Sequence, residues 1–256
     1  MAEESNTAPN GGSASKGVPT NVTPAADTRS LFQGPCAGLS ASARVIGDIP
    51  NVLFRYSKRT FLEYFLFNGL ICLHPASYFR DLCLTKGQQD DELGRTSNLD
   101  LKRFNITVTP VQGGQPLPLS GLTKVSMRRE LKDQYGKWHD YYLFCTSESC
   151  EEILYSDFEA DSCIRILDPK TFIARLNESC NRQLGECRVF CGRVTYFNSA
   201  EPHYEKTNLD LIFRKDQTRY AHQKEYRFAI LCERSVRLKE MEYIRLGSIV
   251  DIAEYV

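Results

Sequence analysis

Residues 220–232 read YAHQKEYRFAILC, and the alternation of apolar and polar side chains predicts a strand over residues 224–232. Successive side chains of a strand point to opposite faces. We therefore expect three apolar side chains to enter the core: Tyr226, Phe228 and Ile230. An amide, a carboxylate and a guanidinium should project from the other face: Gln223, Glu225 and Arg227. Such a face suits recognition of sugar hydroxyls, and equally a solvated Glu225–Arg227 ion pair, which would contribute little to stability.

The elements around this strand mix helices and strands without regular alternation. Apolar spacing predicts one helix between a capping Ser57 and Gly69, and a second that runs from Asp168-Pro169 to Leu184. A short helix or turn is expected over residues 77–84. Further strands are predicted at residues 52–56, 70–73, 104–109, 140–145, 162–167, 188–197, 236–246 and 249–256. The pattern predicts an α+β fold with a mostly antiparallel β core and a few helices in a single compact domain.

The N-terminal segment differs in composition from the rest of the chain. Of its first 30 residues, 22 are Ala, Ser, Asn, Thr, Pro or Gly. Such a segment buries too little apolar surface to offset the entropy of ordering. We therefore predict a disordered low-complexity tail over residues 1–43 and a single α+β domain over residues 44–256.

Charge and hydropathy limit the classes of protein to which this chain can belong. Lys plus Arg and Asp plus Glu each number 32, which argues against broad binding to phosphate backbones. We see neither a secretory signal nor an apolar stretch long enough for a membrane helix. The sequence thus predicts a cytoplasmic protein with no membrane contact. Its ten cysteines, none of them in a CxxC pair, should then be free and mostly buried thiols.

No metal site is predicted from the cysteines. Cys187 and Cys191, with His203 downstream, lack the tight spacing of structural zinc ligands. His139 and Cys145 share a strand face by spacing, but no third group marks a nucleophilic pair.

An acidic run leaves one metal-dependent alternative open. Asp90, Asp91 and Glu92 would suit Mg²⁺ if further carboxylates converged on them. A Mg²⁺-dependent nuclease built from Asp90, Asp91 and Glu225 requires these carboxylates close together.

Three short motifs occur in an order known from one enzyme family. Arg55 stands on the first predicted strand, Thr146-Ser147 ends a middle strand, and Gln223-Lys224-Glu225 opens the late strand. This order resembles the Arg–Ser–Glu class of mono-ADP-ribosyltransferases, whose motifs are Arg, Ser-Thr-Ser and Glu/Gln-x-Glu. Cys145 departs from the first Ser of the triplet. The resemblance implies a split β core and an NAD-dependent transferase that acts on a protein or nucleic acid target.

The resemblance also implies roles for particular residues, with NAD as substrate and no metal. Glu225 would stabilise an oxocarbenium-like transition state, as in glycoside hydrolysis. The other catalytic residues implied are Gln223, which would orient the nucleophile, and Ser147, which would support Glu225 or the ribose. The cofactor-binding residues are Arg55 on a phosphate, Thr146 from the middle motif, and Tyr56 and Tyr78 stacking on nicotinamide. We expect the Glu225 side chain to lie outside the core, so Glu225→Gln should change stability by less than about 1 kcal/mol.

A second resemblance covers most of residues 50–230. The segments at residues 53–56, 68–70, 77–81 and 222–227 resemble a group of uncharacterised bacterial proteins associated with phage-defence or abortive-infection loci. A toxin or phage-defence effector is therefore expected. A non-catalytic binding or sensor module, with the face from Gln223 to Arg227 as its partner surface, stays open as an alternative.

Overall fold

The computed structural model describes residues 20–21, 43–80, 84, 90, 92, 94–100, 107–110, 115, 117–118, 124–130, 140–198, 211–232 and 241–256. The chain divides into two units, one of residues 1–25 with 100–123 and one of residues 26–99 with 124–256. In the smaller unit, β6 (Thr107–Pro110) pairs antiparallel with β1 (Thr20–Asn21) and with β7 (Leu117–Pro118). Apart from β1 and Ala43, the predicted tail lies outside the described residues.

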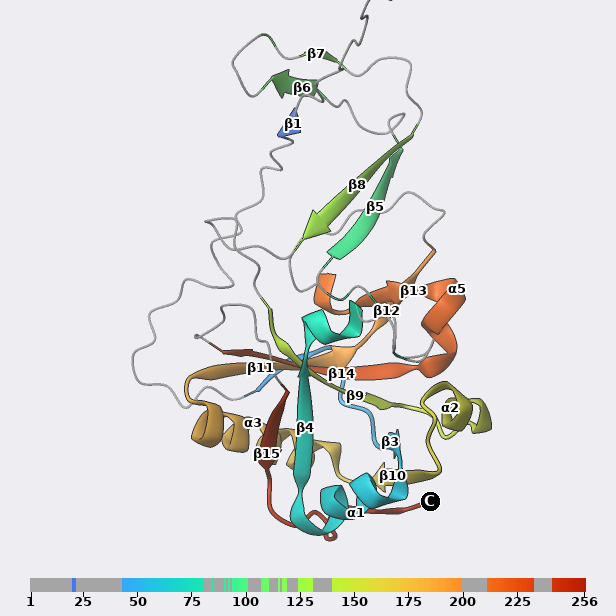
Figure 1. The fold of residues 1–256 in the computed structure, drawn as a ribbon, viewed down its shortest axis with the longest axis vertical. Coiled ribbons are helices and arrows are strands. Elements are labelled where there is room, and N and C mark those ends of the chain that lie inside the picture. The colour runs from blue at the N-terminus through green and yellow to red at the C-terminus, as the bar shows by residue number, and fades with distance from the viewer. Residues whose placement is uncertain are drawn as a thin grey trace, which may run out of the picture. The chain divides into compact units, whose positions relative to one another are not determined.

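The larger unit is built on a nine-stranded sheet, seven strands of which follow the order β16-β10-β3-β9-β14-β11-β2 (Figure 1). The remaining two strands are β4, which pairs with β9, and β15, which pairs with β4. The strands are β2 (Arg44–Ile46), β3 (Leu53–Ser57), β4 (Leu70–Pro75), β9 (Tyr142–Ser147), β10 (Ser162–Ile166), β11 (Cys187–Arg193), β14 (Glu225–Cys232), β15 (Glu242–Arg245) and β16 (Ala253–Tyr255). Within this sheet only β11 and β2 run parallel. The predicted α+β fold with a mostly antiparallel core is confirmed.

Smaller elements complete this unit. Two further two-stranded sheets pair β12 (Thr195–Phe197) with β13 (Arg214–Asp216), and β5 (Gly94–Asp100) with β8 (Lys124–Glu130). The helices are α1 (Arg59–Asn68), α2 (Glu152–Asp157), α3 (Pro169–Leu184) and α5 (Gln217–Tyr220), with short 3-10 turns η2 (Ala76–Arg80) and η3 (Ala221–Gln223). No sequence pattern predicted α2, α5, β2, β5, β8 and β13.

Both faces of strand β14 are buried. Tyr226, Phe228 and Ile230 enter the main core, where they meet the apolar sides of α1 and α3, as predicted. Ala229 and Leu231 point the other way, into a second apolar cluster. All eight residues of β14 are buried, so its second face is not the solvated surface that the alternation suggested.

The sheet is split where β9 meets its neighbours on one side. β3 pairs with β9 at one residue pair, Phe54 with Ser147. β4 pairs with β9 at two residue pairs, His74 with Leu143 and Pro75 with Tyr142. Beyond these points β3 continues beside β10, and β4 continues beside β15. The two strands therefore diverge from β9 and leave a gap over its middle residue, Cys145.

Local signals set the helix ends, with one exception. Gly69 ends α1 in the left-handed conformation at φ 58°, and Asp168 caps α3 by accepting a hydrogen bond from Thr171 N at 3.0 Å, both as predicted. Ser57 was wrongly expected to cap α1; it is the last residue of β3, and no side chain of the capping residue bonds this end. Instead the N–H of Arg59 donates to Asp161 Oδ1 at 2.6 Å, which satisfies one of the free donors there.

The eight cysteines within the described residues are free thiols, and five of them are buried, in agreement with the prediction. Cys36 and Cys83 lie outside those residues. Among the helices that the structure describes, none has the length and apolar character needed to cross a membrane.

Candidate functional site

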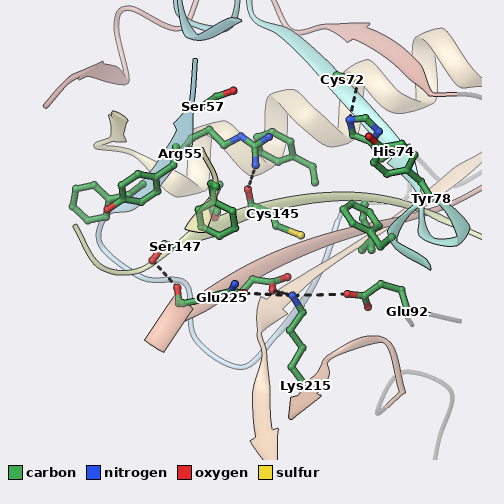
Figure 2. Close-up of a pocket in the computed structure, with 18 residues that line it drawn as sticks. Arg55, Ser57, Cys72, His74, Tyr78, Glu92, Cys145, Ser147, Lys215 and Glu225 are labelled. Atoms are coloured by element: carbon green, nitrogen blue, oxygen red, sulfur yellow. Dashed lines mark hydrogen bonds and ion pairs between the residues drawn. The ribbon is translucent and has the colours of Figure 1, made fainter. Parts of the chain in front are cut away.

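A pocket opens at the split in the sheet (Figure 2). The space between its walls is about 960 Å³, a volume that includes open solvent. Its walls come from β3, β4, η2, β9, β13, η3 and β14. All seven predicted site residues line it: Arg55, Tyr56, Tyr78, Thr146, Ser147, Gln223 and Glu225.

Arg55 lies in the gap between the diverging strands. Its Nη1 donates to the carbonyl oxygen of Cys145 at 2.6 Å, and its guanidinium carbon lies 4.8 Å from the ring centroid of Phe144. Burial lowers the pKa of Arg55 below its ordinary value, while the neighbouring Cys145, Cys72 and Glu225 oppose this shift. Among the described residues the guanidinium forms no ion pair. The side chain therefore presents a positive charge that is free to meet an anionic ligand.

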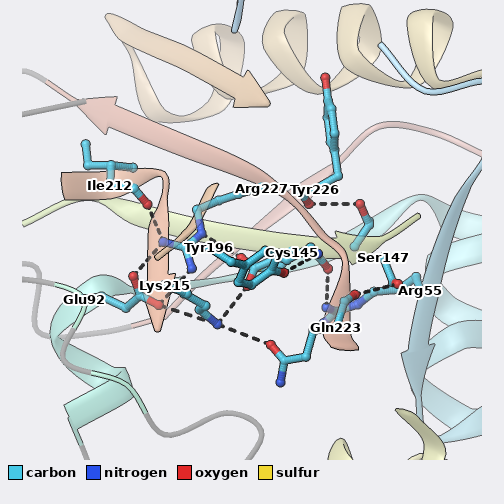
Figure 3. A network of polar contacts seen from close by, with 12 residues as sticks. Arg55, Glu92, Cys145, Ser147, Tyr196, Ile212, Lys215, Gln223, Tyr226 and Arg227 are labelled. Atoms are coloured by element: carbon cyan, nitrogen blue, oxygen red, sulfur yellow. Dashed lines mark hydrogen bonds and ion pairs between the residues drawn. The ribbon is translucent and has the colours of Figure 1, made fainter. Parts of the chain in front are cut away.

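Glu225 belongs to a buried network of four charges (Figure 3). Arg227, which has no exposed surface, donates from Nε to Glu225 Oε1 at 2.6 Å and from Nη1 and Nη2 to the two oxygens of Glu92 at 2.6 and 2.9 Å. It also bonds the carbonyl oxygen of Ile212. Lys215 Nζ lies 2.8 Å from Glu225 Oε2 and 3.9 Å from Glu92. The network therefore contains two cations, Arg227 and Lys215, and two anions, Glu225 and Glu92, and the sum of their formal charges is zero.

This network fixes the protonation of Glu225. Burial alone would raise the pKa of its carboxyl, but the charges of Arg227 and Lys215 outweigh burial and hold that pKa well below its usual range. Burial would likewise lower the pKa of Lys215, but Glu225 and Glu92 raise it above its ordinary value. The carboxylate and the ammonium are therefore both charged at neutral pH, and Glu225 is a very weak base.

Two predictions about this segment are wrong. Glu225 is 5 % exposed, so it forms a buried ion pair with Arg227 rather than a solvated one, and Glu225→Gln falls inside the core. Gln223 does not lie on the strand: it ends the η3 turn, and Lys224 takes a left-handed conformation at φ 42° before β14 begins. The alternation of residues in the sequence could not reveal this left-handed turn before the strand, because Lys rarely adopts a positive φ. Gln223 still reaches the pocket, with its Oε1 3.5 Å from Lys215 Nζ.

The hydroxyl groups of the β9 motif bond to the main chain. Ser147 Oγ donates to the carbonyl oxygen of Gln223 at 2.8 Å and accepts from Ser149 N at 3.1 Å. Thr146 Oγ1 donates to the carbonyl oxygen of Tyr226 at 3.0 Å. These bonds tie the end of β9 to the segment that carries Glu225.

The two predicted tyrosines differ in their surroundings. Tyr56 is buried; its hydroxyl donates to Ser149 O at 3.0 Å and accepts from Glu151 N at 2.9 Å, so it orders the loop after β9. Tyr78 is 38 % exposed and stacks on His74. Only Tyr78 has a ring surface available for a ligand.

Three of the pocket residues that were not predicted from the sequence carry polar side chains that matter below: Cys72, His74 and Lys215. Cys72 and His74 alternate on β4, but the predicted strand ended at residue 73, one residue before His74. Lys215 belongs to a short strand that the periodicity did not reveal.

Glu92 was noted only as part of an acidic run, but it binds Arg227. Asp91 lies outside the described residues, so the arrangement required by the nuclease alternative is not tested. The described residues contain no group of three or more side chains that could hold a metal ion.

Three cysteines were considered in the sequence as metal ligands or nucleophiles: Cys187, Cys191 and Cys145. Cys187 and Cys191 are buried on β11, and His203 and His139 lie outside the described residues. Burial, followed by the charge of Glu225, raises the pKa of Cys145 far above its ordinary value, so this thiol is not a ready nucleophile.

Comparison of the chain with models of known protein families, with curated protein sequences and with solved structures gave no significant match.

Proposed function

We propose that the protein binds NAD⁺ at the split of the sheet and transfers its ADP-ribose group to a macromolecular acceptor. One observation carries the proposal: Arg55, Ser147 and Glu225, which are far apart in the sequence, line one pocket. Gln223 from the same motif lines it as well. This is the combination that the resemblance to Arg–Ser–Glu mono-ADP-ribosyltransferases implies.

Arg55 would hold the pyrophosphate of NAD⁺. Its planar guanidinium can bind two phosphate oxygens at once, and it forms no ion pair among the residues that the structure describes. One of its nitrogens is oriented by Cys145 O, which leaves other N–H groups for the ligand.

Glu225 would act on the ribose. In the reaction the bond between ribose C1′ and the nicotinamide nitrogen breaks, with its electron pair leaving on nicotinamide, and the acceptor's nucleophile then bonds to C1′ and releases its proton to water. A fixed carboxylate stabilises the positive charge that develops on the ribose. Each oxygen of Glu225 already accepts one bond, and each keeps a lone pair for a ribose hydroxyl.

The low pKa of Glu225 limits its role. Because Arg227 and Lys215 hold the carboxylate ionised, Glu225 would be a poor acceptor for the proton of the nucleophile. Its contribution is therefore electrostatic. Ser147, through its bond to Gln223 O, is a positioning residue for the turn that leads to Glu225.

The pairing of Glu225 with two cations also favours a second candidate, a module that binds a nucleotide without cleaving it. Both counter-charges weaken the negative potential that an oxocarbenium ion requires. Such a module would use the same pocket as a sensor.

The test measures nicotinamide release and the transfer of labelled ADP-ribose from NAD⁺, with protein and nucleic acid acceptors supplied separately. We expect release by the wild-type chain and at least a hundredfold loss in Glu225→Gln, the scale of losing a key electrostatic group. NAD⁺ binding without release would support the sensor, and absence of NAD⁺ binding would refute both. A bacterial cytoplasmic role as a toxin or phage-defence effector extends this proposal.

A further inference from the structure

The end of the pocket opposite Ser147 is aromatic (Figure 2). His74, on β4, stacks on Tyr78 with ring centroids 4.5 Å apart and planes 29° apart. Phe79 meets both rings edge-on, at 6.1 and 5.6 Å. All three side chains line the pocket. Aromatic clusters of this kind are good platforms for planar bases.

His74 also offers an unused polar atom. Its Nε2 lies 3.5 Å from Cys72 Sγ, whereas its Nδ1 is buried and has no hydrogen-bond partner among the described residues. Burial, followed by the charge of Arg55, lowers the pKa of His74, so the imidazole is neutral at pH 7. A buried polar atom without a partner is costly, so a ligand atom that hydrogen-bonded to Nδ1 would remove that cost.

The order of groups along β9 shows which part of a ligand reaches His74. Glu225 is paired with Ser147, Arg55 bonds Cys145, and His74 is paired with Leu143. Ser147 lies four residue steps along the strand from Leu143, about 13 Å at the rise of an extended chain. The pocket thus presents a carboxylate, then a cation, then an aromatic platform with a free nitrogen.

From this order we propose that His74 and Tyr78 form the subsite for the adenine base of NAD⁺. The inference rests on the proposed function, which assigns ribose to Glu225 and pyrophosphate to Arg55. With those parts fixed, the nicotinamide half lies at the Ser147 end and the adenosine half lies beyond Arg55. His74 Nδ1 bonds an edge of the purine, and the exposed ring of Tyr78 packs against it.

The experiment measures binding of three probes to the full chain by calorimetry: NAD⁺, ADP and nicotinamide mononucleotide. ADP carries the base assigned to His74, and nicotinamide mononucleotide lacks it. His74→Phe keeps an aromatic ring beside Tyr78 and removes the nitrogen. We expect it to weaken ADP and NAD⁺ binding by about tenfold, the value of one lost hydrogen bond to a buried group. Binding of nicotinamide mononucleotide should stay within about twofold.

Two further variants complete the design. His74→Asn places an amide near the position of Nδ1 and should restore part of the ADP affinity. Tyr78→Leu changes a partly exposed ring and should weaken ADP binding even if His74→Phe fails to fold.

The outcomes separate this inference from the proposed function. If NAD⁺ is cleaved and His74→Phe weakens nicotinamide mononucleotide as much as ADP, the subsite assignment is wrong and the transferase stands. If ADP binds through His74 but NAD⁺ is never cleaved, the transferase is wrong and the subsite stands. If ADP does not bind the wild-type chain, the inference is overturned.

Discussion

Replacing Glu225 with Gln removes one charge from a buried network of four. The variant loses the ion pairs of Glu225 with Arg227, at 2.6 Å, and with Lys215, at 2.8 Å. Removing one partner of a buried pair leaves the other charge uncompensated, which costs about 3–5 kcal/mol. For a domain of this size that is a fall in Tm of roughly 6–20 °C. Since typical stabilities are about 5–15 kcal/mol, much of the variant should still fold at low temperature.

A matched variant separates stability from catalysis. Glu92→Gln removes an equally buried carboxylate that bonds the same guanidinium, so it should destabilise the chain by a similar amount. NAD⁺ cleavage per folded molecule should fall at least a hundredfold in Glu225→Gln and far less in Glu92→Gln. The assay pairs urea unfolding with nicotinamide release at a temperature where both variants are folded.

A double variant sharpens the comparison. Adding Lys215→Met to Glu225→Gln removes one charge of each sign and should recover part of the lost stability without restoring cleavage. Equal activity in Glu225→Gln and Glu92→Gln would refute the catalytic role of Glu225. A loss of stability below about 1 kcal/mol in Glu225→Gln would refute the reasoning about the network.

Other predictions concern single features. Arg55→Lys should weaken NAD⁺ binding more than turnover, since it keeps the charge and loses the planar fork, and a split between KM and kcat would show this. Asp168→Ala should cost about 1 kcal/mol in urea unfolding by removing the cap of α3, without changing NAD⁺ binding. Gly69→Ala should cost more than about 2 kcal/mol, because φ is 58° and the added Cβ would lie within 1.9 Å of Gly247 O; an unchanged Tm contradicts this. The pKa of His74 is lower in the folded chain than in the unfolded chain, so the unfolded chain binds a proton at His74 more readily. Stability should therefore decline as the pH falls below about 6.5, and His74→Phe should lessen that decline.

Much of the fold follows from local patterns. The helix from Asp168 to Leu184 was predictable because its cap, its proline and its four-residue apolar repeat all agree. The alternation of Tyr226 and Phe228 likewise identified a core strand. The elements that were not predicted have seven residues or fewer, and so few residues show too little periodicity to identify a helix or a strand.

The site was predictable in part, and for a different reason. The motifs named Arg55, Ser147 and Glu225, and the pocket brings these three together. Their surroundings were not predictable, because Lys215 reaches Glu225, and Glu92 reaches Arg227, only through the tertiary fold. No local pattern distinguishes an ion pair that will be buried from one that stays in solvent.

Arg55 rests on the same aromatic cluster that holds the domain together. Phe144, over which its guanidinium lies, has ring contacts with Phe65, Phe172 and Phe228 at 6.0, 6.0 and 5.7 Å. Interiors packed this tightly transmit small changes of volume. A change of volume in the interior would therefore also shift the guanidinium of Arg55, even through a residue such as Phe172 that does not line the pocket.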